Sequence, residues 1–147
     1  MKCLVTGGAG FIGSHLVDRL LADGNQVRVI DNFSTGRQEN LSRYQDNKNL
    51  TVIKADVSDF DSIKMHFYDV DRVFHIAALA DIVPSIVNPL DYYRANVSGT
   101  ASVLEAARVA KVKKLVYAAS SSCYGIPDSF PTSESGEICP EYPYALT

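Results

Sequence analysis

The chain has 147 residues, of which 46% are hydrophobic and 21% charged, and its formal net charge is −3. This length fits one compact domain, and the composition is typical of a globular protein. The mild acidity disfavours binding to nucleic acid or to an anionic membrane. No apolar run approaches the ~20 residues that would span a bilayer, and the N-terminus lacks a secretory signal. We therefore expect a cytoplasmic protein.

The cysteines and histidines indicate neither a disulfide framework nor a metal site. Cys3, Cys123 and Cys139 are odd in number, and none belongs to a Cys-x-x-Cys pair. We expect three free thiols, one of them in a buried strand. The three histidines show no arrangement typical of metal ligands. We expect His75, at the end of a strand, to be a packed and hydrogen-bonded core residue.

Strands and helices alternate along the chain. In order, the patterns predict a strand over Lys2–Thr6, a helix over Phe11–Ala22, a strand over Gln26–Ile30, a weak helix around Gln38–Tyr44, a strand over Leu50–Lys54, a helix over Asp59–Phe67, a strand over Asp71–Ile76, a long helix over Asn88–Ala110 and a strand over Lys113–Ala118. Ser58 is the candidate N-cap of the helix that begins at Asp59. Residues 121–143 are loop-like, and Tyr144–Thr147 resembles the first turn of a further helix.

This alternation predicts an α/β fold with a doubly wound parallel sheet that helices cover on both faces. Strands in such sheets are apolar almost throughout, as Val27–Ile30 and Leu115–Ala118 are. Ligands of these sheets bind at the carboxyl ends of the strands, near the point where the strand order reverses. The residues that directly follow each strand are therefore the candidates for a site.

A glycine-rich turn, Gly7–Gly13, follows the first strand and opens the first helix. Gly7 permits a sharp turn, Gly10 leaves room for phosphate oxygens, and Gly13 allows the helix to pack close to the strand. The free N–H groups and the positive dipole end of the helix would then face the pyrophosphate of a dinucleotide. The alternative is a plain tight turn without a ligand.

Polar residues after the second and third strands fit the adenosine end of NAD. Asp31 can accept hydrogen bonds from both ribose hydroxyls and would repel a 2′-phosphate, which favours NAD over NADP. Asn32 and Ser34 would add polar contacts. Asp56 could accept the adenine amino group, and Val57 could lie against the adenine ring. The alternative for Asp31 is a solvated loop carboxylate.

Six stretches together resemble the extended short-chain dehydrogenase/reductase family, and within it the nucleotide-sugar epimerases. They are Val5–Leu16 (VTGGAGFIGSHL), Asp31–Gly36 (DNFSTG), His75–Leu79 (HIAAL), Asn96–Thr100 (NVSGT), Ser120–Gly125 (SSSCYG) and Tyr142–Thr147 (YPYALT). The resemblance covers the whole chain in order. It implies a Rossmann-type fold that is cut before its last helix and strands.

The resemblance implies NAD-dependent 4-epimerisation of a UDP-hexose, such as UDP-glucose, UDP-galactose or their N-acetyl forms, through a transient 4-keto sugar. Tyr144 would be the base and Ser120 the donor that orients the reacting oxygen. Ser121, Ser122 and Ser85 would contact the substrate. A phenol ordinarily has a pKa of ~10, so the family relies on the nicotinamide and on a lysine four residues after the tyrosine to lower it. The alternatives are a capped polar loop at Ser120–Ser122 and a core or interface tyrosine at 144.

The residues that we expect to bind the cofactor lie after the first four strands. They are Gly7, Gly10, Phe11, Ile12, Gly13, Asp31, Asn32, Ser34, Asp56, Val57, Ala77, Ala78 and Ala80. The small residues from Ala77 to Ala80 would leave room for the nicotinamide end. Asn96 would either brace the helix or the site through its amide or lie on the helix surface.

The chain ends at Thr147, one residue before the expected lysine. We expect residues 1–147 to be an incomplete NAD-binding domain, without the C-terminal substrate domain, and to be inactive as they stand. In the family, the long helix over residues 88–110 lines a homodimer interface, so a homodimer is expected. The residues that choose the sugar lie mostly in the absent half.

Other functions of the same fold stay open. A 4,6-dehydratase would need an acidic pair where Ser121 and Ser122 stand, and a decarboxylase would carry a glutamate there. A non-catalytic NAD-binding regulator would keep Gly7–Gly13 and Asp31 but would not need Ser120 together with Tyr144.

Overall fold

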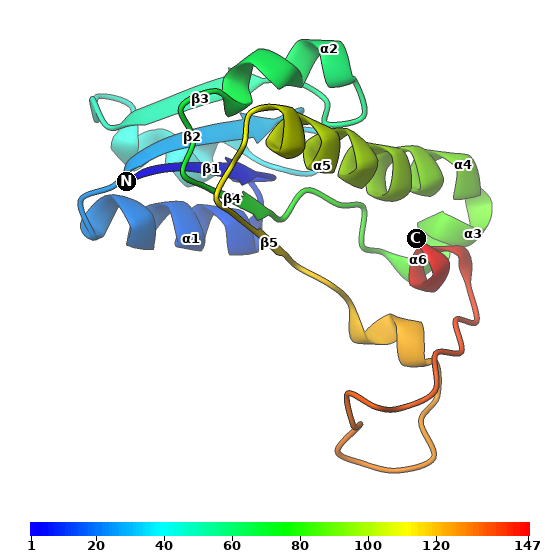
Figure 1. Cartoon of the computed structure of the whole chain (residues 1–147). Coiled ribbons are helices and arrows are strands. Elements are labelled where there is room, and N and C mark those ends of the chain that lie inside the picture. Colours follow the sequence, from blue (N-terminus) through cyan, green and yellow to red (C-terminus); the bar gives the residue numbers. More distant parts are fainter.

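The computed structural model describes residues 1–147 and shows a five-stranded parallel sheet with helices on both faces (Figure 1). Its strands are β1 (Lys2–Thr6), β2 (Gln26–Asp31), β3 (Leu50–Lys54), β4 (Arg72–His75) and β5 (Lys114–Tyr117). They lie in the order β3-β2-β1-β4-β5, and every neighbouring pair is parallel. The doubly wound α/β fold expected from the sequence is confirmed.

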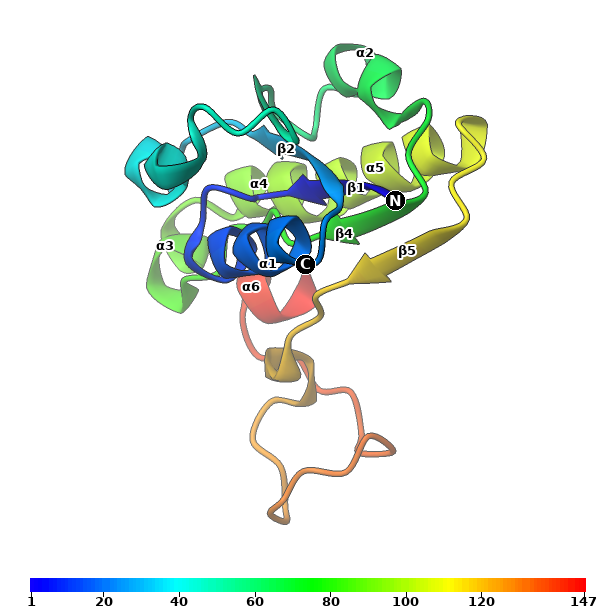
Figure 2. The same ribbon diagram turned by 90° about the vertical axis from the view of Figure 1, so that its left-hand side faces the viewer.

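The helical segments connect these strands. They are α1 (Phe11–Ala22), η1 (Gln38–Tyr44), α2 (Phe60–Ile63), η2 (Lys64–Phe67), α3 (Ile82–Val87), α4 (Pro89–Tyr92), η3 (Tyr93–Ser98), α5 (Gly99–Val109), η4 (Ser121–Tyr124) and α6 (Pro143–Leu146). η3 is a π-helix, and the other η segments are 3-10 helices. None of the helices is both long and apolar enough to cross a membrane. Between η4 and α6, a long loop extends away from the sheet (Figures 1 and 2).

Two apolar clusters lie on opposite faces of the sheet, as α1 and α5 do in Figure 2. The cluster under α1 and η1 consists of Cys3, Val5, Ala9, Val17, Leu20, Val27, Val29 and Leu41. The cluster under α2, η2 and α5 consists of Leu4, Ile30, Val57, Ile63, Phe67, Val70, Val73, Val103, Ala106 and Ala107. Each large side chain that is fully buried in this way contributes about 1.5–3 kcal/mol of stability. The alternation of Cys3, Leu4 and Val5 between the two clusters explains why β1 is apolar throughout.

The helix expected over Asp59–Phe67 is shorter and is capped differently. It begins at Phe60 and changes to a 3-10 turn at Lys64. Asp59 is the N-cap, because its Oδ1 accepts the Ser62 N–H at 3.3 Å. The expectation that Ser58 caps this helix is wrong, since the Ser58 hydroxyl donates instead to Asp56 Oδ1 at 2.8 Å.

The region around the long helix also differs from the expectation. α3 was not predicted, because Pro84 interrupts the helical pattern; it lies in the first turn, where a helix needs no N–H donor. The helix expected over Asn88–Ala110 runs from Pro89 to Val109 and contains the π-helical segment η3. In the segment expected to be a loop, η4 forms a single 3-10 turn after Ser120.

The strand expected over Lys113–Ala118 is present as β5, shortened to Lys114–Tyr117. It pairs with β4, and within residues 1–147 Val116 and Tyr117 are 40% and 49% exposed.

A buried polar chain joins the ends of β1 and β4 to α5. Thr6 Oγ1 accepts the N–H groups of Ile76 at 3.2 Å and Ala77 at 3.3 Å. Its own proton therefore points to His75 Nδ1, 2.6 Å away. His75 Nε2 then carries the ring proton and donates to Thr100 Oγ1 at 2.9 Å. His75 is 1% exposed, so the expected hydrogen-bonded core histidine is confirmed, and its burial lowers its pKa from 6.5 to about 4.

This burial makes stability depend on pH. Below pH ~6.5 the unfolded chain protonates His75 while the folded chain does not, so stability falls as the pH drops toward 4. Between about pH 7.5 and about pH 5, we expect this histidine to remove about 2 kcal/mol from the free energy of unfolding. Urea titrations of His75→Gln should lack that loss, whereas the exposed control His15→Gln should retain it. An unchanged pH dependence in His75→Gln would contradict the assignment.

Candidate functional site

The turn from Gly7 to Gly13 is built on two close backbone contacts. Gly7 has φ +69°, and a Cβ there would lie 2.7 Å from the backbone N and Cα of Ala77. A Cβ on Gly13 would lie 2.1 Å from the Gly7 carbonyl oxygen. Neither position accommodates a side chain. Gly10 is less constrained, since its Cβ would meet only the Gly7 oxygen at 3.2 Å, which leaves it open on the side that faces away from the turn.

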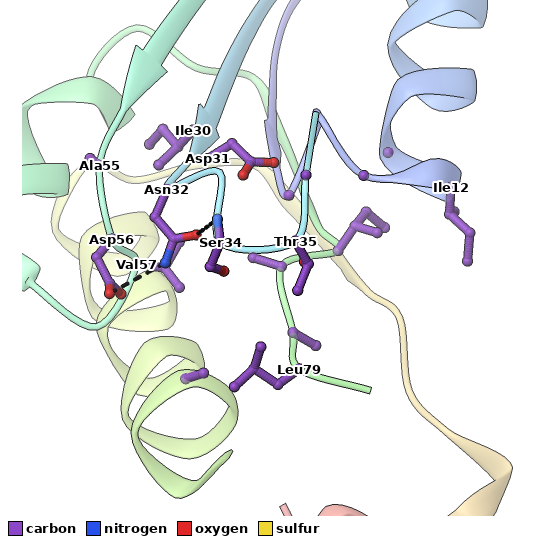
Figure 3. Close-up of a pocket in the computed structure, with 18 of the residues that line it drawn as sticks. Ile12, Ile30, Asp31, Asn32, Ser34, Thr35, Ala55, Asp56, Val57 and Leu79 are labelled. Atoms are coloured by element: carbon purple, nitrogen blue, oxygen red, sulfur yellow. Dashed lines mark hydrogen bonds between the residues drawn. The ribbon is translucent and has the colours of Figure 1, made fainter. Parts of the chain in front are cut away.

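A cleft of about 300 Å³ opens at the carboxyl ends of β1, β2, β3 and β4, where the strand order reverses (Figure 3). It is lined by every residue predicted to bind the cofactor except Ala80. Further lining residues that we did not predict are Ile30, Thr35, Gly36, Ala55, Ile76, Leu79 and Ala95. Thr35 and Gly36 belong to the Asp31–Gly36 stretch that carries part of the family resemblance. Ala95 lies in η3 and lines the cleft because of how that segment packs.

The Asp31 carboxylate lies at the inner end of this cleft and is 7% exposed. Its Oδ2 accepts the Ala9 N–H at 2.9 Å, and its Oδ1 accepts the Phe33 N–H at 2.8 Å. Each oxygen therefore keeps a further lone pair for another donor. A Cβ on Gly36 would lie 2.9 and 3.0 Å from these oxygens, so a side chain at position 36 would crowd the carboxylate.

Asn32 connects the end of β2 to the end of β3. Its Oδ1 accepts the Ser34 N–H at 2.9 Å, and its Nδ2 donates to Asp56 Oδ2 at 3.4 Å (Figure 3). Asp56 Oδ1 accepts both the N–H and the hydroxyl of Ser58. Partial burial opposes ionisation of Asp56, but these hydrogen bonds and the Arg94 charge outweigh it and hold the pKa of Asp56 below its usual value. The carboxylate is thus a fixed acceptor at the rim of the cleft.

The mouth of the cleft combines exposed apolar side chains with helix N–H groups. Phe11 and Ile12 begin α1 and are 79% and 63% exposed, although both are large and apolar. The N–H groups of this first turn have no partner within the helix. Together they offer an anion-binding end and an apolar surface that a ligand could cover.

A second group of candidate residues surrounds α6. Ser120 precedes η4, and its Oγ accepts the Ser122 N–H at 3.2 Å. η4 packs against α6, so the structure brings the Ser120–Ser122 turn and Tyr144 into the same region. The Tyr144 ring packs edge-on against that of Tyr92, with 6.3 Å between the ring centroids. This group lies beside the cleft rather than within its lining.

Ser85 and Asn96 are both buried and both contact α6. Ser85 is fully buried, and its Oγ accepts the Tyr144 N–H at 3.1 Å. Asn96 accepts the Leu79 N–H at 2.8 Å and donates to the Leu79 carbonyl at 3.0 Å. Its Nδ2 also donates to Thr147 Oγ1 at 3.1 Å. Of the two roles considered for Asn96, the structure shows the brace and not the helix surface.

Two other tyrosines near Tyr144 in the sequence, Tyr124 and Tyr142, have different surroundings. Tyr124 ends η4, and its hydroxyl donates to the Glu134 carbonyl at 3.4 Å. Tyr142 is the N-cap residue of α6. No three His, Cys, Asp or Glu side chains gather as metal ligands would.

Comparison with known proteins decides the family. The family model for GDP-mannose 4,6 dehydratase matches residues 4–147. The chain belongs to this family. The resemblance to nucleotide-sugar epimerases and dehydratases noted in the sequence is thereby confirmed.

Members of the family from other organisms match along almost the whole chain. A UDP-glucose 4-epimerase from Mycolicibacterium smegmatis is 44% identical over 99% of this chain and 47% of its own length. The structure of a UDP-N-acetylglucosamine 4-epimerase from Methanobrevibacter ruminantium has a TM-score of 0.92 and 41% identity, covering 99% of this chain and 46% of that one. A dTDP-glucose 4,6-dehydratase from Streptomyces venezuelae, solved with NAD bound, has a TM-score of 0.94 and 34% identity, covering 99% and 48%. The chain thus spans about half the length of these family members.

Gly13 and Gly10 differ in the space around them, which predicts different costs in stability when each is replaced by alanine. Gly13→Ala should lower the free energy of unfolding by about 3 kcal/mol or more, because its Cβ would overlap backbone that cannot move aside. Gly10→Ala, the matched control, should cost less than about 1 kcal/mol. Urea denaturation followed by circular dichroism measures both. Equal costs for the two substitutions would contradict the close packing at Gly13.

Proposed function

We propose that this chain is the NAD-binding part of a nucleotide-sugar 4-epimerase that acts on a UDP-hexose. The observation that carries the proposal is the pairing of two features in one fold. A cleft with a buried carboxylate, Asp31, lies at the strand-order reversal. Beside it, a serine turn at Ser120 packs against the short helix that bears Tyr144. The family members that the chain matches include two 4-epimerases.

The cleft fits NAD in shape and in chemistry. Gly7 and Gly13 allow the tight turn, and the absence of a side chain at Gly10 leaves room for a pyrophosphate at the start of α1. The free lone pairs of Asp31 suit two ribose hydroxyls, and its negative charge would repel a 2′-phosphate. Asn32 and Ser34 would lie along the ribose, and Asp56 with Val57 beside the adenine. Ala77 and Ala78 would face the nicotinamide end, with Ala80 just beyond the cleft.

Asp31→Asn tests this assignment. The substitution keeps the shape of the side chain but removes its charge, so NAD should bind about tenfold more weakly or worse, with a smaller loss for NADP. Isothermal titration of both dinucleotides measures the ratio, and Asp46→Asn, at an exposed position, is the matched control. If NAD affinity and the preference over NADP both persist in Asp31→Asn, the cleft does not bind the ribose in this way.

Held in the cleft by the Gly7–Gly13 turn and Asp31, NAD would supply the removal of a hydride from C4 of the sugar and its return to the opposite face. Tyr144 would take the proton of the 4-hydroxyl and give it back to the 4-keto oxygen. Ser120 would donate a hydrogen bond to the same oxygen and so orient it. Ser121 and Ser122, in the turn held by Ser120, are proposed to contact the sugar. The role of the serine is to hold the reacting oxygen near the phenol, where proximity lowers the barrier.

Tyr144→Phe should lower kcat by about a thousandfold, because it removes only the hydroxyl that would take up and return the proton. NAD affinity should stay unchanged, since Tyr144 lies outside the cleft lining. The measurement is the turnover of UDP-glucose and of UDP-N-acetylglucosamine by the protein that the whole gene encodes. Tyr124→Phe is the matched control and should retain most of the activity. Ordinary turnover by Tyr144→Phe would assign the base elsewhere.

Sugar recognition and assembly complete the proposal. Residues 1–147 would supply the NAD-binding domain, and a substrate domain would correspond to the half of the relatives that this chain does not match. Without such a region we expect no turnover. We also propose a homodimer through the helical run from Pro89 to Val109. Leu90, Tyr93 and Leu104 of this run are exposed apolar residues that suit an interface.

Two other functions are less well supported. A 4,6-dehydratase or a decarboxylase of the same fold would need acidic groups after Ser120, where the chain has Ser121 and Ser122. A non-catalytic NAD-binding regulator would not need a serine turn packed against Tyr144. Assays for dehydration and decarboxylation alongside epimerisation separate the enzymes from one another, and NAD binding without any turnover would favour the regulator.

A further inference from the structure

The hydroxyl of Ser85 is enclosed within the protein rather than open to a ligand. Ser85 lies in α3 and is 0% exposed. Its Oγ lies 2.5 Å from the Ile82 carbonyl oxygen and 3.1 Å from the Tyr144 backbone nitrogen. The first contact lies within α3, and the second joins α3 to α6, which lie far apart in the sequence but side by side in the fold.

The chemistry of a hydroxyl decides the direction of both hydrogen bonds. A serine hydroxyl has one proton and two acceptor lone pairs. A carbonyl oxygen cannot donate, so the proton goes to Ile82. A backbone N–H cannot accept, so Tyr144 donates to a lone pair of the same oxygen. With its proton used and its surface closed, Ser85 has no donor left for a substrate.

The start of α6 depends on this contact. Tyr142, its N-cap residue, makes no side-chain capping bond. Within its first turn, the N–H of Tyr144 would otherwise have no partner. Ser85 supplies the missing cap from another helix, while Asn96 holds the other end through Thr147.

We propose that Ser85 is a positioning residue for Tyr144. It fixes the backbone of the tyrosine while Tyr92 packs against the ring, so the phenol is directed by two contacts from different helices. This inference rests on the proposed function, in which Tyr144 is the base. It replaces the substrate contact that we expected for Ser85 from the sequence.

Amide hydrogen exchange of the wild-type protein tests the contact without any activity. Tyr144 and Ala145 both lie in the first turn of α6, where neither N–H has a partner in the helix. If Ser85 accepts the Tyr144 N–H, that amide should exchange at least about tenfold more slowly than the Ala145 amide. Equal exchange of the two amides would overturn the proposal.

Kinetics of Ser85→Ala test the positioning role. We expect kcat to fall about 10- to 100-fold, because a small misplacement of a reacting group costs that much. KM and NAD affinity should change less than about twofold, and Ser85→Thr, which keeps the hydroxyl, should recover part of kcat. Ser62→Ala is the matched control, since the Ser62 hydroxyl also bonds the carbonyl three residues earlier, that of Asp59 at 2.9 Å, but makes no hydrogen bond to another helix.

The outcomes separate this inference from the proposed function. A wild-type protein that neither binds NAD nor turns over a nucleotide-sugar refutes the proposed function. An active wild type with unchanged kcat in Ser85→Ala refutes the positioning role alone. A parallel loss of NAD affinity and kcat in Ser85→Ala also refutes it, because a structural defect would lower both.

Discussion

The carboxyl ends of β1 and β4 meet so closely that only glycine fits at position 7. A Cβ there would lie 2.7 Å from the backbone of Ala77, and the positive φ of Gly7 turns the chain away at the same point. These two strands are neighbours in the sheet but are distant in sequence. Gly7 and Ala77, the residues in contact, both line the cleft. The other lining residues follow the ends of the neighbouring strands or lie on the helices beside them.

Buried hydrogen bonds connect the ends of β1 and β4 to the helices around them. Thr6 and His75 link the two strand ends to each other and to Thr100 of α5. Asn96, in the π-helical segment, holds both backbone groups of Leu79 at the cleft wall. π-helical turns are frequent at functional sites. Because these buried groups are all hydrogen-bonded inside the protein, they hold the loops around the cleft rigidly in place.

The two halves of the candidate site have different structural origins. The cleft is formed by strand ends and is supported by the sheet. Ser120 instead precedes a 3-10 turn that packs against α6, and Tyr144 lies in α6, which packs against α3 and α4. Ser85, Tyr92 and Asn96 supply that placement from the helical side. We therefore expect the proposed dinucleotide binding and the proposed proton transfer to respond separately to substitutions.

The order of the strands, the glycine turn and the carboxylate at the end of β2 could all be predicted from the sequence. These features depend on the local spacing of apolar residues and on glycines and a carboxylate at fixed positions, all of which can be read along the chain. The capping of α2 by Asp59 could not, because Ser58 and Asp59 are both residue types that cap helices, and α3 could not, because Pro84 interrupts its pattern. The same holds for Ser85: its residue type suggests a ligand contact, and only the packing of α3 against α6 turns its hydroxyl toward Tyr144. The sequence thus determined which chemical groups this protein has, while the tertiary structure decided which of them face a ligand and which hold the others in place.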